Sequence, residues 1–151
     1  MNLQRLIIAA VMLSPASSMS QGTTAPTIAM ELALTAPEVE YVQFPGAPAG
    51  LLSAIVVGNL GESAPYVLRN KLPPNFTFAP HKHVQWRVLT VIEGTVYFAY
   101  GDKIDAGKLR AFGPGSVIVE PKDVWHYLLT KDQPAVVQYV GEGPGTTTMA
   151  P

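Results

Sequence analysis

The sequence contains no cysteine, which excludes disulfide bonds and any chemistry based on a thiol. Charged residues are also scarce, at 14% of the chain, and the formal net charge is -1. Binding to nucleic acid or to an anionic membrane depends on clustered Lys and Arg side chains, and the sequence has no such cluster. We therefore expect neither nucleic acid nor a membrane surface as a partner.

Long apolar runs and several common catalytic motifs are absent as well. The apolar run from Leu6 to Leu13 is far shorter than the roughly 20 residues that span a bilayer. The sequence has no G-x-S-x-G motif and no glycine-rich phosphate loop that ends in Lys-Ser or Lys-Thr. A serine hydrolase of that type and a P-loop enzyme are therefore not expected.

The first residues have the layout of a secretory signal peptide. Arg5 precedes the apolar run, and small residues follow it up to Ser20. We predict a signal peptide over residues 1–20, a flexible lead over 21–30, and a periplasmic or secreted location for the remaining chain. After cleavage, no segment would anchor the protein to a membrane.

From residue 31 to about 148 the chain alternates short runs of Val, Ile, Leu and Tyr with turn residues, at intervals of about ten residues. No stretch of helical length has a 3.6-residue period with caps at both ends. This pattern predicts a single all-β domain, closed into a barrel or folded as a two-sheet jelly roll so that few strand edges stay exposed. The predicted strands are EYVQF, LLSAIVV, YVLRNKL, HVQWRVLTVI, TVYFAY, SVIVE, WHYLLT and AVVQYV.

The chain has only three histidines, His81, His83 and His126. Alternate residues of a strand face the same side, so His81, His83, Gln85 and Arg87 would share one face if no bulge intervenes. Three imidazoles with an open fourth position suit a metal such as Zn, Fe, Ni, Cu or Mn. Three histidines that bond only to one another and to water are the alternative interpretation.

The segment from His81 to Gly94 resembles the first motif of the cupin family, a His-x-His followed by three or four residues, a Glu, six residues and a Gly. His81, His83 and Gly94 fit this pattern, whereas Arg87 stands where the family has its Glu.

The second cupin motif is a Gly, five residues, Pro-x-Gly, two residues and a His. Gly115, Pro121 and His126 fit it, with Asp123 in the place of the second glycine. The resemblance covers roughly residues 31–145 and implies a single cupin-type jelly-roll barrel, also called a double-stranded β-helix. It also implies that His81, His83 and His126 are metal ligands, and that sheet edges could form a homodimer. On its predicted face, Gln85 could bind a ligand through its amide or support the metal ligands from beside them.

Arg87 leaves three interpretations open. A three-histidine metal site could persist, with Arg87 turned away or paired with Glu120 or Glu93. Arg87 could instead point inward and bind an anionic substrate through its planar fork of donors. In the third interpretation the metal has been lost, and the pocket binds a small anion or is purely structural.

The function predicted from these observations is that of an exported single-domain cupin that binds a divalent metal through three histidines. Such a protein could be a metalloenzyme that acts on a small molecule, of the oxygenase or isomerase type. The alternative is a non-catalytic cupin that binds a metal or a small anion, with Arg87 holding the anion. Because cupins perform many reactions, the resemblance does not decide between enzyme and binding protein.

Overall fold

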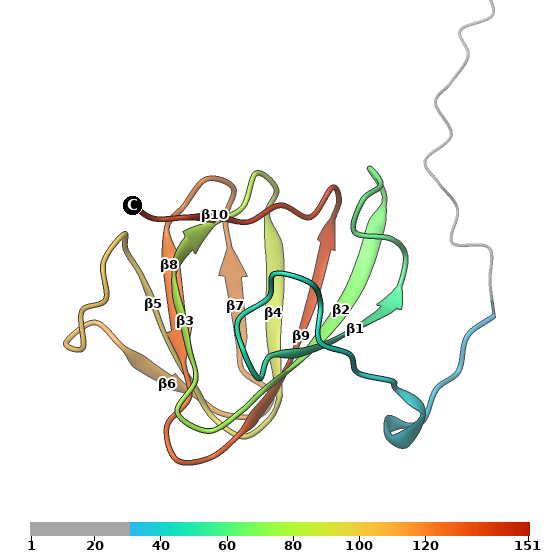
Figure 1. Ribbon diagram of the computed structural model, residues 1–151, viewed down its shortest axis with the longest axis horizontal. Coiled ribbons are helices and arrows are strands. Elements are labelled where there is room, and N and C mark those ends of the chain that lie inside the picture. Colours follow the sequence, from blue (N-terminus) through green and yellow to red (C-terminus); the bar gives the residue numbers. More distant parts are fainter. Residues whose placement is uncertain (1–30) are drawn as a thin grey trace, which may run out of the picture.

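The computed structural model describes residues 31–151, which form two β-sheets of five strands each (Figure 1). A single turn of 3-10 helix, Ala36–Glu38, precedes the sheets. The strands are β1 (Leu52–Val57), β2 (Pro65–Leu72), β3 (Thr77–Lys82), β4 (Arg87–Glu93), β5 (Val96–Tyr100), β6 (Arg110–Phe112), β7 (Val117–Glu120), β8 (His126–Leu129), β9 (Ala135–Glu142) and β10 (Thr148–Met149).

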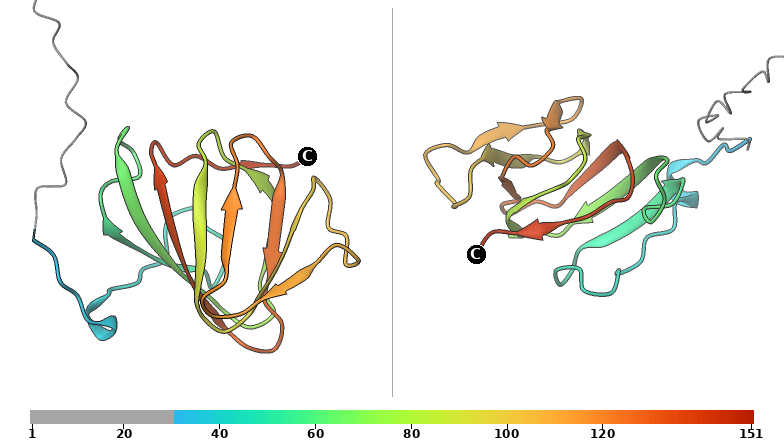
Figure 2. Two further views of the ribbon diagram at one scale, coloured as in Figure 1. Left: turned by 180° about the vertical axis from the view of Figure 1, so that it is seen from behind. Right: turned by 90° about the horizontal axis from the view of Figure 1, so that it is seen from above.

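The two sheets have the strand orders β1-β2-β9-β4-β7 and β10-β3-β8-β5-β6, and every one of these pairings is antiparallel. Most neighbours are distant in sequence, as with β2 beside β9 and β3 beside β8. The sheets face each other as the two walls of a barrel (Figures 1 and 2). This arrangement is a jelly roll, or double-stranded β-helix, and it confirms the predicted all-β fold class.

The hydrophobic core fills the space between the sheets because inward positions along each strand are apolar. In β9 the side chains of Val137 and Tyr139 are buried and alternate with more exposed neighbours. Leu89 on β4 and Leu128 on β8 are no more than 1% exposed and meet the core from opposite sheets. Full burial of each such side chain contributes about 1.5–3 kcal/mol to the free energy of unfolding.

Several strand predictions were wrong in their bounds. The run HVQWRVLTVI is not one strand, because β3 ends at Lys82 and β4 begins at Arg87 in the other sheet. The run EYVQF forms only an isolated bridge between Val42 and Ser53. The strand β3 itself was missed. It contains Pro80, which lacks an amide donor and lies where the pairing with β8 is irregular.

The predicted signal peptide and the predicted lead, residues 1–30, lie outside the described residues. Within residues 31–151, no helix has the length and hydropathy that a membrane crossing requires.

Candidate metal centre

The three histidines meet inside the barrel, at one end of β3 and β8. His81 on β3 and His126 on β8 are direct cross-strand partners, and His83 lies just after the end of β3. All three are buried, and one ring nitrogen from each lies within 4.8 Å of the others. The ring centroids of His81 and His126 are 4.4 Å apart, and that of His83 lies 5.0 and 5.2 Å from them. The two histidine segments, 43 residues apart at their closest members, therefore form one cluster.

Each imidazole is oriented by a backbone carbonyl. The Nδ1 atom of His81 donates to Ala79, that of His83 to Thr146, and that of His126 to Val124. A carbonyl oxygen only accepts hydrogen bonds, so each Nδ1 carries a proton, and in a neutral ring the Nε2 atom then presents a lone pair. None of the three Nε2 atoms has a hydrogen-bond partner among residues 31–151. Orientation of a histidine through its second nitrogen is typical of metal sites.

Burial keeps two of the imidazoles neutral at physiological pH. It lowers the pKa of His81 to about 3, aided by the neighbouring His126. It lowers the pKa of His83 to about 4, aided by the positive charge of Arg87. A neutral imidazole is the form that binds a metal, so no proton has to leave these two rings near pH 7.

Glu120, at the end of β7, is the functional residue that the sequence analysis did not place in the site as a ligand. Its side chain is fully buried, and its Oε2 atom lies 3.3 Å from Nε2 of His126 and 3.7 Å from Nε2 of His83. Its Oε1 atom has no partner in the described chain. The signal that would have found it is the alternation along SVIVE, since Ile118 and Glu120 share the buried face.

Arg87 is the ionic partner of Glu120. The two residues are opposite each other on β4 and β7, and Nε of Arg87 donates to Oε2 of Glu120. The guanidinium carbon also lies 4.1 Å from the ring centroid of Tyr139. Burial by itself would raise the pKa of Glu120, but the charge of Arg87 and the contact with His126 outweigh it and hold the pKa well below its usual range. Of the two carboxylates considered as partners of Arg87, Glu120 is the one observed.

The expected carboxylate is therefore present, but on the neighbouring strand. The first cupin motif has its Glu at the position of Arg87, and this chain has Glu120 directly across the β4–β7 ladder from it. The second motif has a glycine where this chain has Asp123, and the fold accommodates the aspartate. Asp123 has a φ of 59°, and its amide donates to the carbonyl of His83. Asp tolerates this left-handed conformation better than most residues other than glycine.

The sequence predicted that Gln85 would share one strand face with the histidines and Arg87, and this prediction was wrong. The chain turns between His83 and Arg87 to pass from one sheet to the other, and Gln85 lies half-buried in that turn. The alternation rule fails here because it holds only within one continuous strand. His81, His83 and Arg87 still reach the interior, from β3, its end, and β4.

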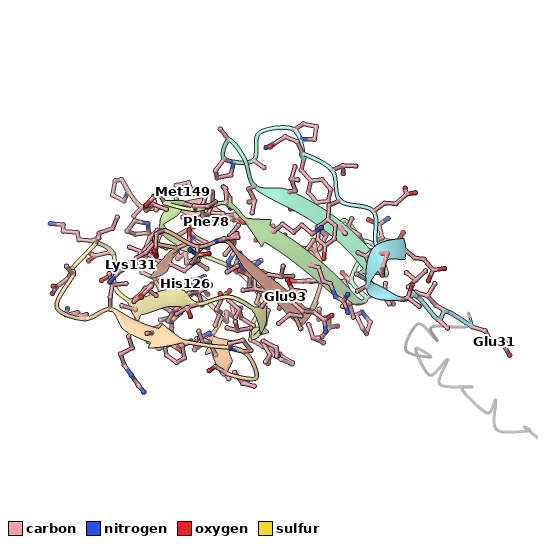
Figure 3. All side chains as sticks on the ribbon, turned by 90° about the horizontal axis from the view of Figure 1, so that it is seen from below. Glu31, Phe78, Glu93, His126, Lys131 and Met149 are labelled. Atoms are coloured by element: carbon pink, nitrogen blue, oxygen red, sulfur yellow. The ribbon has the colours of Figure 1, made fainter. Side chains whose placement is uncertain are left out.

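A cavity of about 620 Å³ adjoins the centre on the side of Arg87. Its wall includes Phe78, which packs against His81 with ring centroids 4.1 Å apart, and Met149 on β10. Both are labelled in Figure 3 together with His126, while Glu93, the other carboxylate considered for Arg87, lies away from them at the far end of β4. The cavity and the histidine centre therefore share Arg87, which lines the cavity and pairs with Glu120.

Comparison with known proteins supports the fold assignment. Residues 69–141 match the Cupin_2 family, described as a cupin domain. The polyketide cyclase RemF from Streptomyces resistomycificus superposes with a TM-score of 0.64 and 22% identity, over 77% of this chain and 82% of that one. A sugar phosphate isomerase of the cupin superfamily from Silicibacter pomeroyi DSS-3 gives 0.59 and 21%, over 74% and 75%.

The DMSP lyase DddQ from Ruegeria pomeroyi DSS-3 also has this fold, with a TM-score of 0.59 and 15% identity over 74% of this chain and 60% of that one. No curated protein sequence gives a significant match. At these identities the three structures establish the common fold and leave the reaction open.

Proposed function

The chain belongs to the cupin superfamily, and we propose that its barrel binds a divalent metal ion through Nε2 of His81, His83 and His126. One observation carries this proposal. Three lone pairs and a carboxylate converge in a buried space, and every one of these groups accepts hydrogen bonds. Buried acceptors that face one another repel unless a cation lies between them.

A proton is the simplest cation that would serve, but it satisfies only one contact. Placed on Nε2 of His126, it would join that ring to Glu120 and leave the Nε2 atoms of His81 and His83 without a partner. A divalent metal satisfies all the nitrogen lone pairs at once. The donor Nε of Arg87 is already used by Glu120, so it does not reach the histidines as a hydrogen-bond donor.

We infer that Glu120 supplies the fourth protein ligand. Its Oε1 atom is buried and unpaired, and its Oε2 atom lies beside two of the three imidazoles. Three neutral imidazoles and one carboxylate suit Zn, Mn, Fe, Ni or Cu. Because Arg87 neutralises Glu120, the site keeps the positive charge of the metal, which favours an anionic ligand at any open position.

We infer further that the protein is an enzyme that acts on a small molecule entering through the adjoining cavity. A bound metal would supply Lewis acid chemistry, which polarises a carbonyl or lowers the pKa of a bound water. The similar structures are named as a cyclase, an isomerase and a lyase. The alternative is a non-catalytic protein that binds the metal or a small anion, and it shares the same ligand set.

The test of the metal proposal is elemental analysis of the purified protein. We expect about one divalent metal per chain. The same protein stripped with a chelator should rebind the metal in a titration, and His126→Ala should weaken that binding at least about 100-fold, since a direct ligand contributes more than an outer partner worth 10–100-fold. Absence of metal from the protein, with no binding in the titration, would refute the proposal.

We also propose that the protein is exported and, in addition, that it forms a homodimer through a sheet edge. Export rests on the layout of residues 1–20, and the dimer rests on the resemblance to other cupins. Sequencing the amino terminus of protein recovered from the periplasm or the medium tests the first. Light scattering on that same material tests the second.

A further inference from the structure

The side chain of Arg87 contacts Glu120 of the histidine centre and also lines the adjoining cavity. Its Nε atom donates to Glu120 inside the metal centre, and its guanidinium lies over the ring of Tyr139. The terminal atoms Nη1 and Nη2 donate to no acceptor within residues 31–151, although the side chain is only 12% exposed. Arg87 also forms part of the wall of the 620 Å³ cavity. The structure therefore presents unused donors of a mostly buried cation at the wall of a cavity.

The rest of the cavity wall is mainly apolar, and much of it comes from two segments that are far apart in the sequence. The loop before β1 contributes Phe44, Pro45 and Leu51, and the carboxyl-terminal segment contributes Met149. The loop is held in shape by the side-chain amide of Gln43, which donates to the carbonyls of Ala47 and Pro48. An apolar enclosure of this kind favours a ligand with a hydrophobic body.

A second polar group lies in the wall of the cavity. Asn70 on β2 is paired with Ser53 on β1, and both residues are buried and contribute to the wall. The Oδ1 atom of Asn70 has no hydrogen-bond donor in the described chain. A buried amide oxygen without a donor favours a ligand that brings one, such as a hydroxyl group.

We propose that this cavity binds a small monocarboxylate with an apolar body, and that Nη1 and Nη2 of Arg87 hold its carboxylate. The fork of a guanidinium matches the two oxygens of a carboxylate. One cation among apolar walls suits a single negative charge on a hydrophobic molecule better than the dianion of a phosphate ester. The proposal rests on the proposed function for what happens to the bound molecule, while binding itself needs only Arg87 and the cavity.

The test compares a carboxylate with its neutral analogue. Binding of 3-phenylpropionate and of 3-phenylpropionamide to the metal-loaded protein is measured by calorimetry, with acetate and inorganic phosphate as further probes. We expect 3-phenylpropionate to bind at least about tenfold more tightly than the amide, and also more tightly than acetate or phosphate. The methyl resonance of Met149, which lines the cavity, should shift on addition of 3-phenylpropionate. Equal binding of acid and amide by the wild-type protein would overturn the proposal.

Two variants separate this proposal from the metal site. Glu120→Gln releases Arg87 from its ion pair, so we expect it to weaken metal binding but to tighten 3-phenylpropionate binding even in metal-free protein. The double variant Arg87→Met with Glu120→Gln removes both charges together and leaves neither buried alone. In that variant we expect the preference for acid over amide to fall to about one.

The results distinguish the two proposals. If the protein contains no metal but Glu120→Gln binds the acid selectively, the metal proposal fails and the cavity proposal stands. If metal is present but the double variant keeps its preference for the acid, the carboxylate is bound by another group and the cavity proposal is wrong. The Met149 resonance and the wild-type comparison need no variant, and the comparison repeated on metal-free wild-type protein separates Arg87 from the metal as the source of the preference even if a variant does not fold.

Discussion

The two sheets contribute different chemistry to the centre. The sheet of β3 and β8 supplies His81 and His126 as direct cross-strand partners, both oriented by backbone carbonyls. The sheet of β4 and β7 supplies Arg87 and Glu120, also cross-strand partners, but as opposite charges. One ladder therefore provides imidazole nitrogens that can bind a cation, and the other provides a buried ion pair that adjusts the local charge.

This difference shows how the chain accommodates an arginine at the position of the motif's glutamate. A lone guanidinium near a dication is costly: at an effective dielectric constant of 20, a distance of about 6 Å gives a repulsion of roughly 5 kcal/mol. The carboxylate of Glu120 links Arg87 to the histidines, because it contacts Arg87, His83 and His126. The carboxylate thus offsets the repulsion and remains available to the metal.

The largest effect is expected when the ion pair is broken from one side. Arg87→Met leaves Glu120 buried without a counter-ion, so we predict a loss of about 3–5 kcal/mol in the free energy of unfolding of metal-free protein. The double variant Arg87→Met with Glu120→Gln should recover most of that loss, because no charge remains buried. Urea denaturation of the metal-free proteins measures both. A single variant as stable as the wild type would show that the pair is solvated in solution.

The next effect is a loss of stability in acid, and it comes from His81 in the ladder of β3 and β8 and from His83 just after the end of β3. The pKa of His81 falls from 6.5 to about 3 on folding and that of His83 falls to about 4, so the unfolded chain binds more protons than the folded chain below pH 6.5. Stability of the metal-free protein should therefore decrease as the pH falls, by about 2 kcal/mol between pH 6.5 and 5.5 for the two rings together.

The ion-pair ladder titrates in a lower range. The pKa of Glu120 is depressed, so its contribution is present above its unfolded pKa of 4.5 and is lost only as the pH falls below that value. Denaturation curves at pH 7.0, 6.5 and 5.5 isolate the histidine effect. A stability that stays constant over this range would contradict the burial of neutral imidazoles.

The sequence predicted the histidine ladder better than the ion-pair ladder, for a physical reason. His81, His83 and His126 lie in motifs with fixed spacing, and the structure brings all three together. The pairing of Arg87 with Glu120 depends on the register between β4 and β7, which a local pattern does not contain. Alternation also failed at Gln85, because the chain changes sheets there.

The shortest elements were missed for a related reason. The strands β6 and β10 have three and two residues, too few for a period to be recognised, and their pairing with β5 and β3 stabilises them. Yet β10 belongs to the segment that orients His83 and lines the cavity. Non-local pairing, which the sequence pattern does not specify, thus positions part of the site.

A smaller effect tests whether the ion-pair ladder contributes to metal binding. Glu120→Gln removes the charge but keeps the shape of the side chain and an oxygen that can still bind a metal, so we predict a loss of about tenfold in metal affinity, less than for removal of a whole ligand. Glu93→Gln is the matched control, because Glu93 lies on the exposed end of β4 and contacts none of the histidines. Competition titration with a chromophoric chelator measures both affinities. If the two variants bind metal equally well, Glu120 is not a ligand and the histidine ladder acts alone.

The smallest effect concerns the backbone carbonyl of Thr146, which orients His83 and lies outside both ladders. A Cβ atom at Gly143 would lie 2.1 Å from the carbonyl oxygen of Glu62, so Gly143→Ala must displace the segment that carries Thr146. Because Nδ1 of His83 donates to Thr146, we expect metal affinity to fall about three- to tenfold. Gly113→Ala is the control, since a Cβ atom there meets nothing within 4 Å. The same chelator competition compares the two, and equal affinities would mean that metal binding does not depend on the carbonyl of Thr146.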